Sequence, residues 1–246
     1  MSGHSKWNNI KRKKEKTDGA RAKVFTKIGR EIAVAVKEGG GNPASNSKLA
    51  ALIAKAKANS VPNDNIQRII KRAEGGDKTE YEAITYEGYG PGGIAVMVET
   101  LTDNRNRTAG SVRHHFDKYG GSLGTTGCVS WSFDRKGVIV IDNEDEELDE
   151  DTVMMDALDA GAADFQPEEG CFTVYTSPDD INTVAKALED KGYKFDSAQI
   201  EMVPQSYQKL DKQEDRDNME KMLDLFEEDD DVQNVWHNWE NADDAE

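Results

Sequence analysis

The chain has 246 residues, of which 36% are hydrophobic and 32% are charged, and its net charge at pH 7 is −17. This length exceeds that of one small domain, so we expect two or three domains with moderate cores, and the apolar content excludes a wholly disordered chain. The N-terminal segment lacks the apolar stretch of a secretory signal, and no apolar run approaches the roughly 20 residues that cross a bilayer, so we expect a cytoplasmic protein without membrane contact.

Positive charge is concentrated in the N-terminal third of the chain. Residues 1–78 hold 18 Lys and Arg against 7 Asp and Glu, a net charge of +11, whereas residues 79–246 hold 13 against 41, a net charge of −28. A basic segment on an acidic body favours binding of a polyanion at one end, while the other end repels it. The alternative is that the lysines only cover solvated helix faces. Because the signs are segregated by segment, we expect nucleic-acid binding.

Residues 1–20 are rich in lysine and have almost no apolar side chains, so they cannot build a core and are expected to form a flexible basic arm. Trp7 lies in this arm beside two asparagines, where an indole could stack on an exposed base. The alternative, that Trp7 anchors the arm on the protein, stays open.

Residues 21–76 are expected to form a helical nucleic-acid-binding domain. Apolar residues recur at helical spacing in 20–38, in 45–59 and after Pro62, and glycines end the first and third of these runs. Short links between three amphipathic helices predict a compact three-helix bundle. Lysines and arginines cover its outer faces and make its surface positive.

The side chains expected to contact nucleic acid are the cations of the arm and of the helices, together with the indole of the arm. They are Lys6, Trp7, Lys11, Arg12, Lys13, Lys14, Lys16, Arg21, Lys23, Lys27, Arg30, Lys55, Arg68, Lys71 and Arg72. Cations of this kind bind phosphates regardless of base sequence, so the predicted binding is strongly salt-dependent.

After the helical domain the pattern changes from helical to alternating. Residues 81–87 and 94–101 predict two strands joined by a glycine-rich loop, and a helix over 107–119 and a strand over 127–133 follow. Residues 79–133 are therefore expected to begin a second, α/β domain.

Residues 134–205 predict a unit of their own. Its elements, in order, are a strand over 137–142, a helix over 148–160, strands over 163–166 and 171–176, a helix over 178–191 and a strand over 194–203. This β-α-β-β-α-β order is that of the ferredoxin-like split unit.

The C-terminal elements are too small to stand alone. A helix over 218–227 and a strand over 232–236 are best placed in the second domain, as its segment 206–238, which makes the ferredoxin-like unit an insertion. Residues 239–246 are expected to form an acidic tail. The sequence thus predicts an α+β fold of three domains.

The glycine-rich loop YEGYGPGG does not predict nucleotide binding, because no Gly-Lys-Ser/Thr follows it and a strand begins where a phosphate-binding loop needs a helix. A structured hairpin loop is favoured, although Tyr89 could stack on an RNA base. Arg105 and Arg107 either hold a phosphate or form salt bridges. Of the adjacent His114 and His115, we expect one exposed and one half-buried side chain.

Catalytic chemistry is not indicated by the remaining polar residues. No nucleophile, base and orienting group converge in the pattern, and the acidic runs 143–151 and 227–231 look like solvated charge. Cys128 and Cys171 are far apart in the sequence and have no metal-ligand spacing, so we expect reduced thiols. We therefore expect no enzyme activity, no metal and no cofactor.

Six segments of the chain follow one another in the order and spacing of one family. They are GHSKWNNIK, REIAVAVKEGG, NSVPNDNI, YEGYGPGG, TDNRNRT and RHHFDKYGGSLG. On these motifs the whole chain resembles the YebC/PmpR family, to which the mitochondrial translational activator of cytochrome c oxidase is related. The resemblance implies a helical N-terminal domain, a second domain closed by the C-terminal segment and an inserted third domain. It also implies that the basic residues contacting nucleic acid are Lys6, Lys11, Arg12, Lys13, Lys14, Arg21, Lys23, Lys27 and Arg30.

The resemblance implies two competing functions, because members of that family are described as DNA-binding transcriptional regulators and also as translation factors for ribosomes stalled at proline-rich sequences. Our first hypothesis is a ribosome-associated translation factor that docks on ribosomal RNA or tRNA through the arm and the helical bundle. The second is a DNA-binding regulator with residues 63–72 as its recognition helix. A third is a scaffold that binds basic partners through the acidic body. No clear dimer element is visible, and we expect a monomer.

Overall fold

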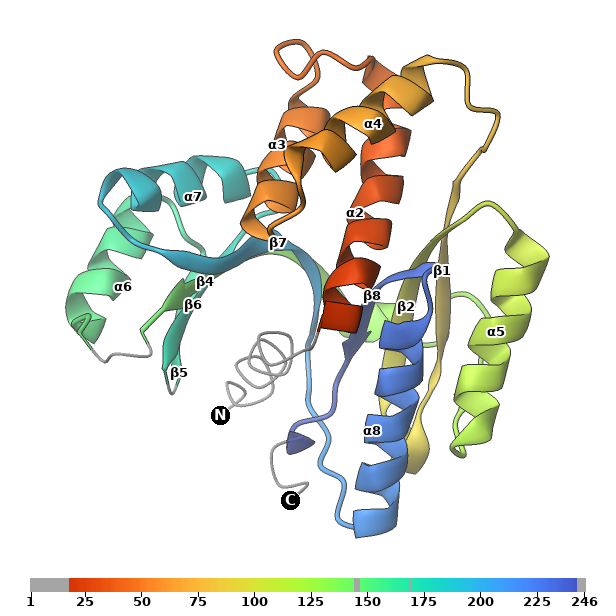
Figure 1. The fold of residues 1–246 in the computed structure, drawn as a ribbon. Coiled ribbons are helices and arrows are strands. Elements are labelled where there is room, and N and C mark those ends of the chain that lie inside the picture. The colour runs from red at the N-terminus through yellow and green to blue at the C-terminus, as the bar shows by residue number, and fades with distance from the viewer. Residues whose placement is uncertain (1–17, 144–146, 169, 243–246) are drawn as a thin grey trace.

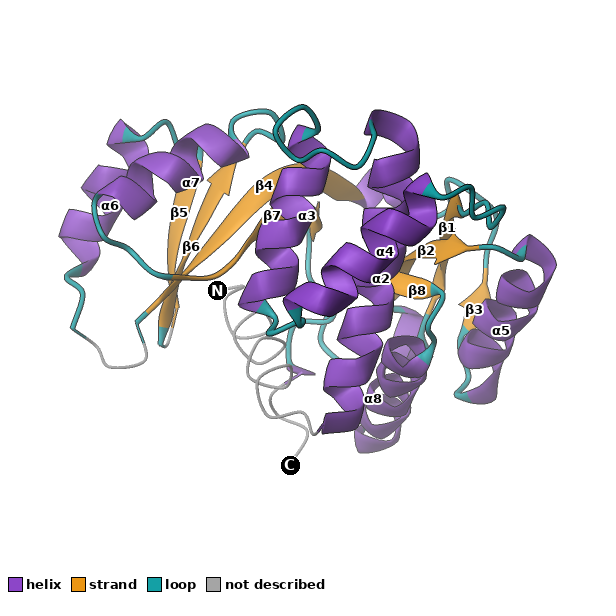
Figure 2. Cartoon of the chain, turned by 45° about the horizontal axis from the view of Figure 1, so that its top comes forward, coloured by secondary structure: helices purple, strands orange, loops and turns teal. Residues whose placement is uncertain are grey.

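The computed structural model of the chain describes residues 18–143, 147–168 and 170–242. Seven α-helices and two antiparallel four-stranded sheets lie within these residues, which confirms the mixed α and β character expected from the sequence. None of the described helices is both long enough and apolar enough to span a bilayer. In both views of the chain, the N-terminal helices lie over the region where the two sheets meet (Figures 1 and 2).

The three N-terminal helices form where the apolar periodicity predicts them. They are α2 (Asp18–Gly39), α3 (Ser47–Ala58) and α4 (Asn63–Glu74). One apolar stripe of each helix faces the same core, which includes Ile32, Leu49 and Ile66, all at most 1% exposed. The stripe facing inward leaves the charged residues of each helix on the outside, as an amphipathic helix requires.

The first sheet has the strand order β3-β1-β2-β8. Its strands are β1 (Glu82–Tyr89), β2 (Ala95–Thr102), β3 (Ser122–Leu123) and β8 (Val232–His237), and its helices are α5 (Arg105–Lys118) and α8 (Gln213–Glu228). The last strand pairs with β2, so the C-terminal segment returns to this sheet. The two-residue strand β3 was not predicted, because so short a strand carries no alternating pattern.

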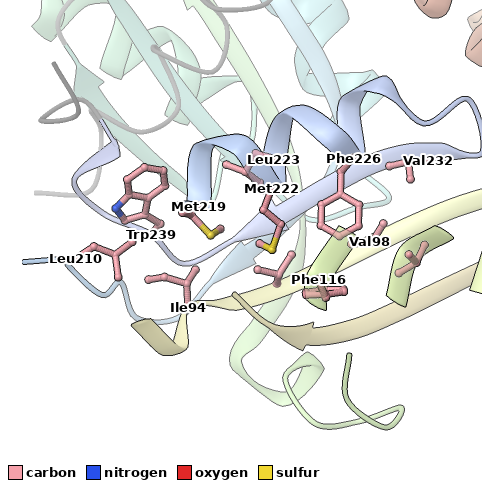
Figure 3. Close-up of a cluster of buried hydrophobic side chains, with 12 residues drawn as sticks. Ile94, Val98, Phe116, Leu210, Met219, Met222, Leu223, Phe226, Val232 and Trp239 are labelled. Atoms are coloured by element: carbon pink, nitrogen blue, oxygen red, sulfur yellow. The ribbon is translucent and has the colours of Figure 1, made fainter. Parts of the chain in front are cut away.

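The core of the first sheet gathers side chains from both ends of its sequence (Figure 3). Phe116 of α5 meets Phe226 of α8 edge to face, with ring centroids 5.1 Å apart. Trp239 is fully buried in the same core, so the prediction of an acidic tail from residue 239 onward is wrong at its start. The residues 243–246 at the end of that predicted tail lie outside the described part of the chain.

The hairpin between β1 and β2 brings the backbone close to this core. At Gly90 an added Cβ would lie 2.8 Å from the sulfur of Met219, which is closer than a real side chain tolerates. Gly92 and Gly93 adopt φ values of 66° and 85°, a region that glycine reaches without strain. The glycine-rich segment is therefore a structured hairpin loop, as the sequence favoured.

The sequence predicts a strand over 127–133, and this prediction is wrong. Strand β4 (Phe133–Asp142) starts only at the end of that segment, and the residues before it form a loop and a short 3-10 turn. The cause is the buried carboxylate of Glu87, which accepts the backbone N–H groups of Gly127 at 2.8 Å and Val129 at 2.9 Å. Those N–H groups are therefore not available to a neighbouring strand.

The second sheet has the strand order β5-β6-β4-β7, with every neighbouring pair antiparallel. Besides β4, its elements are α6 (Glu150–Asp159), β5 (Asp164–Glu168), β6 (Cys171–Thr176), α7 (Ile181–Asp190) and β7 (Phe195–Pro204). This order and these connections are those of a split β-α-β-β-α-β unit. The division of the chain into three domains at the stated boundaries stays a prediction.

Replacing Trp239 by alanine is expected to lower the free energy of unfolding by about 3–5 kcal/mol, because a large buried side chain is lost and a cavity remains. Urea denaturation followed by circular dichroism measures this loss. Trp131→Ala is the matched control: Trp131 is 73% exposed, and its loss should cost less than about 1 kcal/mol. Equal losses in the two variants would contradict the burial of Trp239.

Candidate nucleic-acid interface

The structure describes only part of the predicted interface. The arm residues Lys6, Trp7, Lys11, Arg12, Lys13, Lys14 and Lys16 lie outside the described residues, and Arg21 lies on α2 with an undescribed side chain. Their contacts with nucleic acid stay predictions. The remaining cations fall into two groups with different surroundings.

Lys23 and Lys27 of α2 contact the end of α8. The Lys23 ammonium donates to the backbone oxygen of Glu228 at 2.9 Å, and the Lys27 ammonium donates to that of Glu227 at 3.1 Å. The last carbonyl groups of a helix have no partner within the helix and carry the negative end of its dipole. The two lysines therefore cap α8 and hold α2 against the C-terminal segment.

Arg30, one turn further along α2, is directed into the protein. Its Nη1 donates to Oδ1 of Asp231 at 2.6 Å and to the backbone oxygen of Leu101 at 3.0 Å. The Arg30 side chain is only 16% exposed. In this structure Arg30 therefore joins the N-terminal helices to the first sheet.

Asp231 lies at the centre of a cluster of donors from three parts of the chain. Besides Arg30, its carboxylate accepts from Arg107 Nη2 at 2.8 Å, Thr108 Oγ1 at 2.6 Å and Thr102 Oγ1 at 3.2 Å. Burial by itself would raise the pKa of Asp231, but the hydrogen bonds from Thr108, Arg107 and Arg30 outweigh burial and lower the pKa. Asp231 is therefore a charged anchor between the N-terminal helices, α5 and β8.

The acidic run 227–231 was predicted to be solvated, and this is wrong for its last member, since Asp231 is 5% exposed. Asp229 in the same run accepts a 3.0 Å hydrogen bond from His115. His115 is half-buried and His114 is exposed, as expected. The sequence carried only a weak signal for this burial, namely that the run ends directly at strand β8, and nothing in its pattern distinguishes Asp231 from the exposed Asp230.

Replacing Asp231 by asparagine at pH 7 is expected to lower the free energy of unfolding by about 3 kcal/mol, because Arg30 loses its charged partner in a buried setting. Asp230→Asn is the matched control, since the neighbouring Asp230 is exposed and its change should stay within about 0.5 kcal/mol. Chemical denaturation of both variants measures the two effects. Similar losses at the two positions would contradict the anchor.

The stability difference between the wild type and Asp231→Asn is expected to depend on pH. Because the folded pKa of Asp231 is lowered, its carboxylate stabilises the fold fully above the ordinary aspartate pKa of about 3.9. This stabilisation is lost as the pH falls through the lowered pKa. Denaturation curves from pH 7 downward should therefore converge below about pH 4, and a gap that stays constant would argue against this titration.

The second group of cations lies on the outer face of α4. Arg68, Lys71 and Arg72 are spaced three and four residues apart, so they share one exposed face, which we call the α4 stripe. Arg72 pairs with Asp77 at 2.7 Å, yet its side chain remains 74% exposed. Exposed ion pairs contribute little and are screened by salt. The α4 stripe is therefore accessible to a phosphate-bearing partner.

Lys55 of α3 also stays on the surface. Its ammonium pairs with Glu31 of α2 at 3.0 Å, and 42% of its side chain is exposed. Between α2 and α4 lies an open hollow of about 250 Å³. It is lined by Phe25, Thr26, Val61, Asn65, Arg68 and Ile69. Apolar surface and one cation of the α4 stripe are thus adjacent.

The three secondary contact candidates differ in their surroundings. Arg107 is bound to Asp231, and its Nη2 also donates to Asp103 at 2.9 Å, so it forms the salt bridges that were one of its two predicted roles. Arg105 forms an exposed pair with Glu82 at 3.2 Å. Tyr89 is 40% exposed, and its hydroxyl donates to a backbone oxygen.

The cysteines are present as thiols in the structure. Cys128 and Cys171 form no disulfide, and burial raises the pKa of the Cys128 thiol. Within residues 18–143, 147–168 and 170–242, no group of three or more His, Cys, Asp or Glu side chains is arranged to hold a metal ion.

The structure thus defines a mixed α and β protein with a basic helical N-terminal part on an acidic body. Two family profiles match it, described as "TACO1/YebC protein N-terminal domain" over residues 5–76 and "TACO1/YebC second and third domain" over residues 81–239. The chain therefore belongs to the TACO1/YebC family.

Full-length relatives agree with this assignment. A protein of Acetivibrio thermocellus named "Probable transcriptional regulatory protein" is 58% identical over 240 residues, which cover 97% of this chain and 99% of the relative. A protein of Ruminiclostridium cellulolyticum with the same name is 56% identical over 247 residues, covering 100% and 99%. The crystal structure of a conserved hypothetical protein from Aquifex aeolicus has a TM-score of 0.82 and 43% identity, and the match covers 92% of each chain.

Proposed function

We propose that the protein is a non-enzymatic regulator of gene expression that binds nucleic acid through its basic arm, the α4 stripe and Lys55. The observation that carries the proposal is the exposed row of Arg68, Lys71 and Arg72 on a segment whose net charge is positive, while the rest of the chain is acidic. Guanidinium groups match phosphate oxygens in geometry and charge, and counterion release favours such contacts at low salt.

The geometry supports a different role for the basic face of α2. Lys23, Lys27 and Arg30 already contact 227–231 and would have to leave these partners to reach a phosphate. Separating Arg30 from Asp231 would cost free energy, because the Asp231 carboxylate is buried and would lose a charged partner. We therefore propose that these three cations position the N-terminal helices and that the phosphate contacts fall on the arm, on α3 and on α4.

We propose RNA as the physiological target, with the protein acting as a monomeric translation factor on cytoplasmic ribosomes stalled at proline-rich sequences. This rests on the family likeness together with the separation of charge along the chain. The basic end would dock on ribosomal RNA or tRNA. The acidic remainder would be held away from phosphates and would position the stalled substrate, and orientation alone can lower a barrier.

A second candidate function is that of a DNA-binding transcriptional regulator. The names of the two relatives favour it, since both are called probable transcriptional regulatory proteins. In this case α4 would enter the major groove, and Arg68, Lys71 and Arg72 would meet phosphates or base edges.

Reversing charge on the α4 stripe, with Arg68→Glu and Lys71→Glu together, is expected to weaken binding to RNA about tenfold or more and to reduce the slope of log affinity against log salt by about 2. Fluorescence anisotropy over a salt series measures both quantities. The control is Lys186→Glu with Lys194→Glu, which makes the same change in net charge at two exposed residues, one on α7 and one directly before β7. Equal weakening of RNA binding in both double variants would show that the loss follows net charge alone, and it would contradict the proposed site.

Ribosome profiling after deletion of the gene separates the two candidate functions. If the protein is a translation factor, deletion should create new pauses concentrated at runs of proline codons. The wild-type gene should remove these pauses, and the Arg68→Glu, Lys71→Glu variant should not. Altered transcript levels without altered pausing would contradict the translation role and support the DNA-binding alternative.

A further inference from the structure

Two exposed aromatic side chains converge on one point of the loop before β4. Trp131 is 73% exposed and Tyr89 is 40% exposed. The indole Nε1 of Trp131 and the hydroxyl of Tyr89 both donate to the backbone oxygen of Cys128, each at 3.0 Å. One carbonyl oxygen therefore fixes the polar ends of both rings. We call Trp131 and Tyr89 the aromatic pair.

The loop that carries this carbonyl is held from inside. The Glu87 carboxylate, on a residue only 4% exposed, accepts the backbone N–H groups of Gly127, Val129 and Ser130 at 2.8–2.9 Å. Three hydrogen bonds to a buried charge are strong and set the path of the chain on both sides of Cys128. The aromatic pair is therefore presented by an ordered loop, which limits the entropy that a partner would lose on binding it.

The chemistry left exposed by this arrangement is that of ring faces. Tyrosine and tryptophan commonly bind partners through O–H and N–H, but here both donors are already used by the protein. The surrounding segment 120–132 contains no charged residue, although the chain is 32% charged overall. A partner would therefore meet flat, polarisable ring faces carried by a segment without charged side chains.

These features favour an unpaired nucleobase over a proline-rich peptide. Every base has a π-face that stacks on an aromatic ring without needing a hydrogen bond from it. A proline-rich peptide also docks on aromatic side chains, but its backbone carbonyls need donors to fix its register, and the donors of this pair are occupied. A segment without charged side chains also suits a base, whose phosphate can be neutralised elsewhere.

We propose that Trp131 and Tyr89 form a stacking surface for an unpaired base of single-stranded RNA. This proposal rests on the proposed function, because the arm and the α4 stripe would bind the phosphates while the aromatic pair binds a base. It adds a contact that is insensitive to salt to one that is strongly salt-dependent.

The test uses the full chain with Trp7→Phe in every sample, so that quenching reports on the remaining tryptophans, and an oligoadenylate as the probe. Trp131→Ala should weaken binding about tenfold, leave the salt slope unchanged and abolish most of the quenching, while Trp131→Phe should retain most of the affinity. Duplex RNA of equal length should bind both variants equally, because its bases are already stacked. Thermal unfolding confirms that the variants are folded.

Several outcomes would overturn the proposal. Equal oligoadenylate affinity for Trp131→Ala and its parent would overturn the stacking surface while leaving the phosphate-binding function standing. So would quenching of Trp131 by a hexaproline peptide without quenching by the RNA, or self-association that depends on Trp131. Absence of RNA binding by the full chain at low salt would overturn both the stacking surface and RNA binding.

Discussion

The arrangement of the chain depends on one buried carboxylate, that of Asp231. It accepts Arg30 from the N-terminal helices and Arg107 and Thr108 from α5, and it precedes β8, the last strand of the first sheet. Three segments separated by as many as 201 residues are thus joined at one charge. A buried charge with several donors specifies one geometry, because any displacement leaves ions unpaired in a poorly solvated site.

This anchor divides the cations of the N-terminal helices into two groups with different roles. Those of α2 are bound to the C-terminal segment, where Lys23 and Lys27 complement the end of α8. Those of the α4 stripe remain on the surface. A count of positive charge along the sequence does not distinguish the two groups, since it does not register which helix faces meet acidic neighbours. The proposed interface is accordingly smaller than the one suggested by composition, and it lies on the side of the helices that the acidic segment leaves uncovered.

The regular elements could be predicted where local pattern decides them. Strand β6 has the predicted bounds, and α2, α3 and α4 follow their apolar spacing. The errors occur where a distant side chain decides: Glu87 keeps the segment 127–133 out of the sheet, and Trp239 is buried by packing against α8. Asp231 and Trp131 were missed for the same reason, because no sequence period reveals which acid is buried or which aromatic ring is exposed. The predicted contacts of the arm lie outside the described residues and stay predictions.

Lysine footprinting by mass spectrometry, with and without bound RNA, tests whether the arm, α3 and α4 hold the contacts with nucleic acid. The wild-type chain would be labelled with an amine-reactive reagent, and the protection of each lysine would be compared. We expect RNA to protect Lys71 on α4, Lys55 on α3 and the lysines of the arm, and Lys186 and Lys221 to be labelled equally in both states. Protection confined to lysines outside the N-terminal helices and the arm would contradict it.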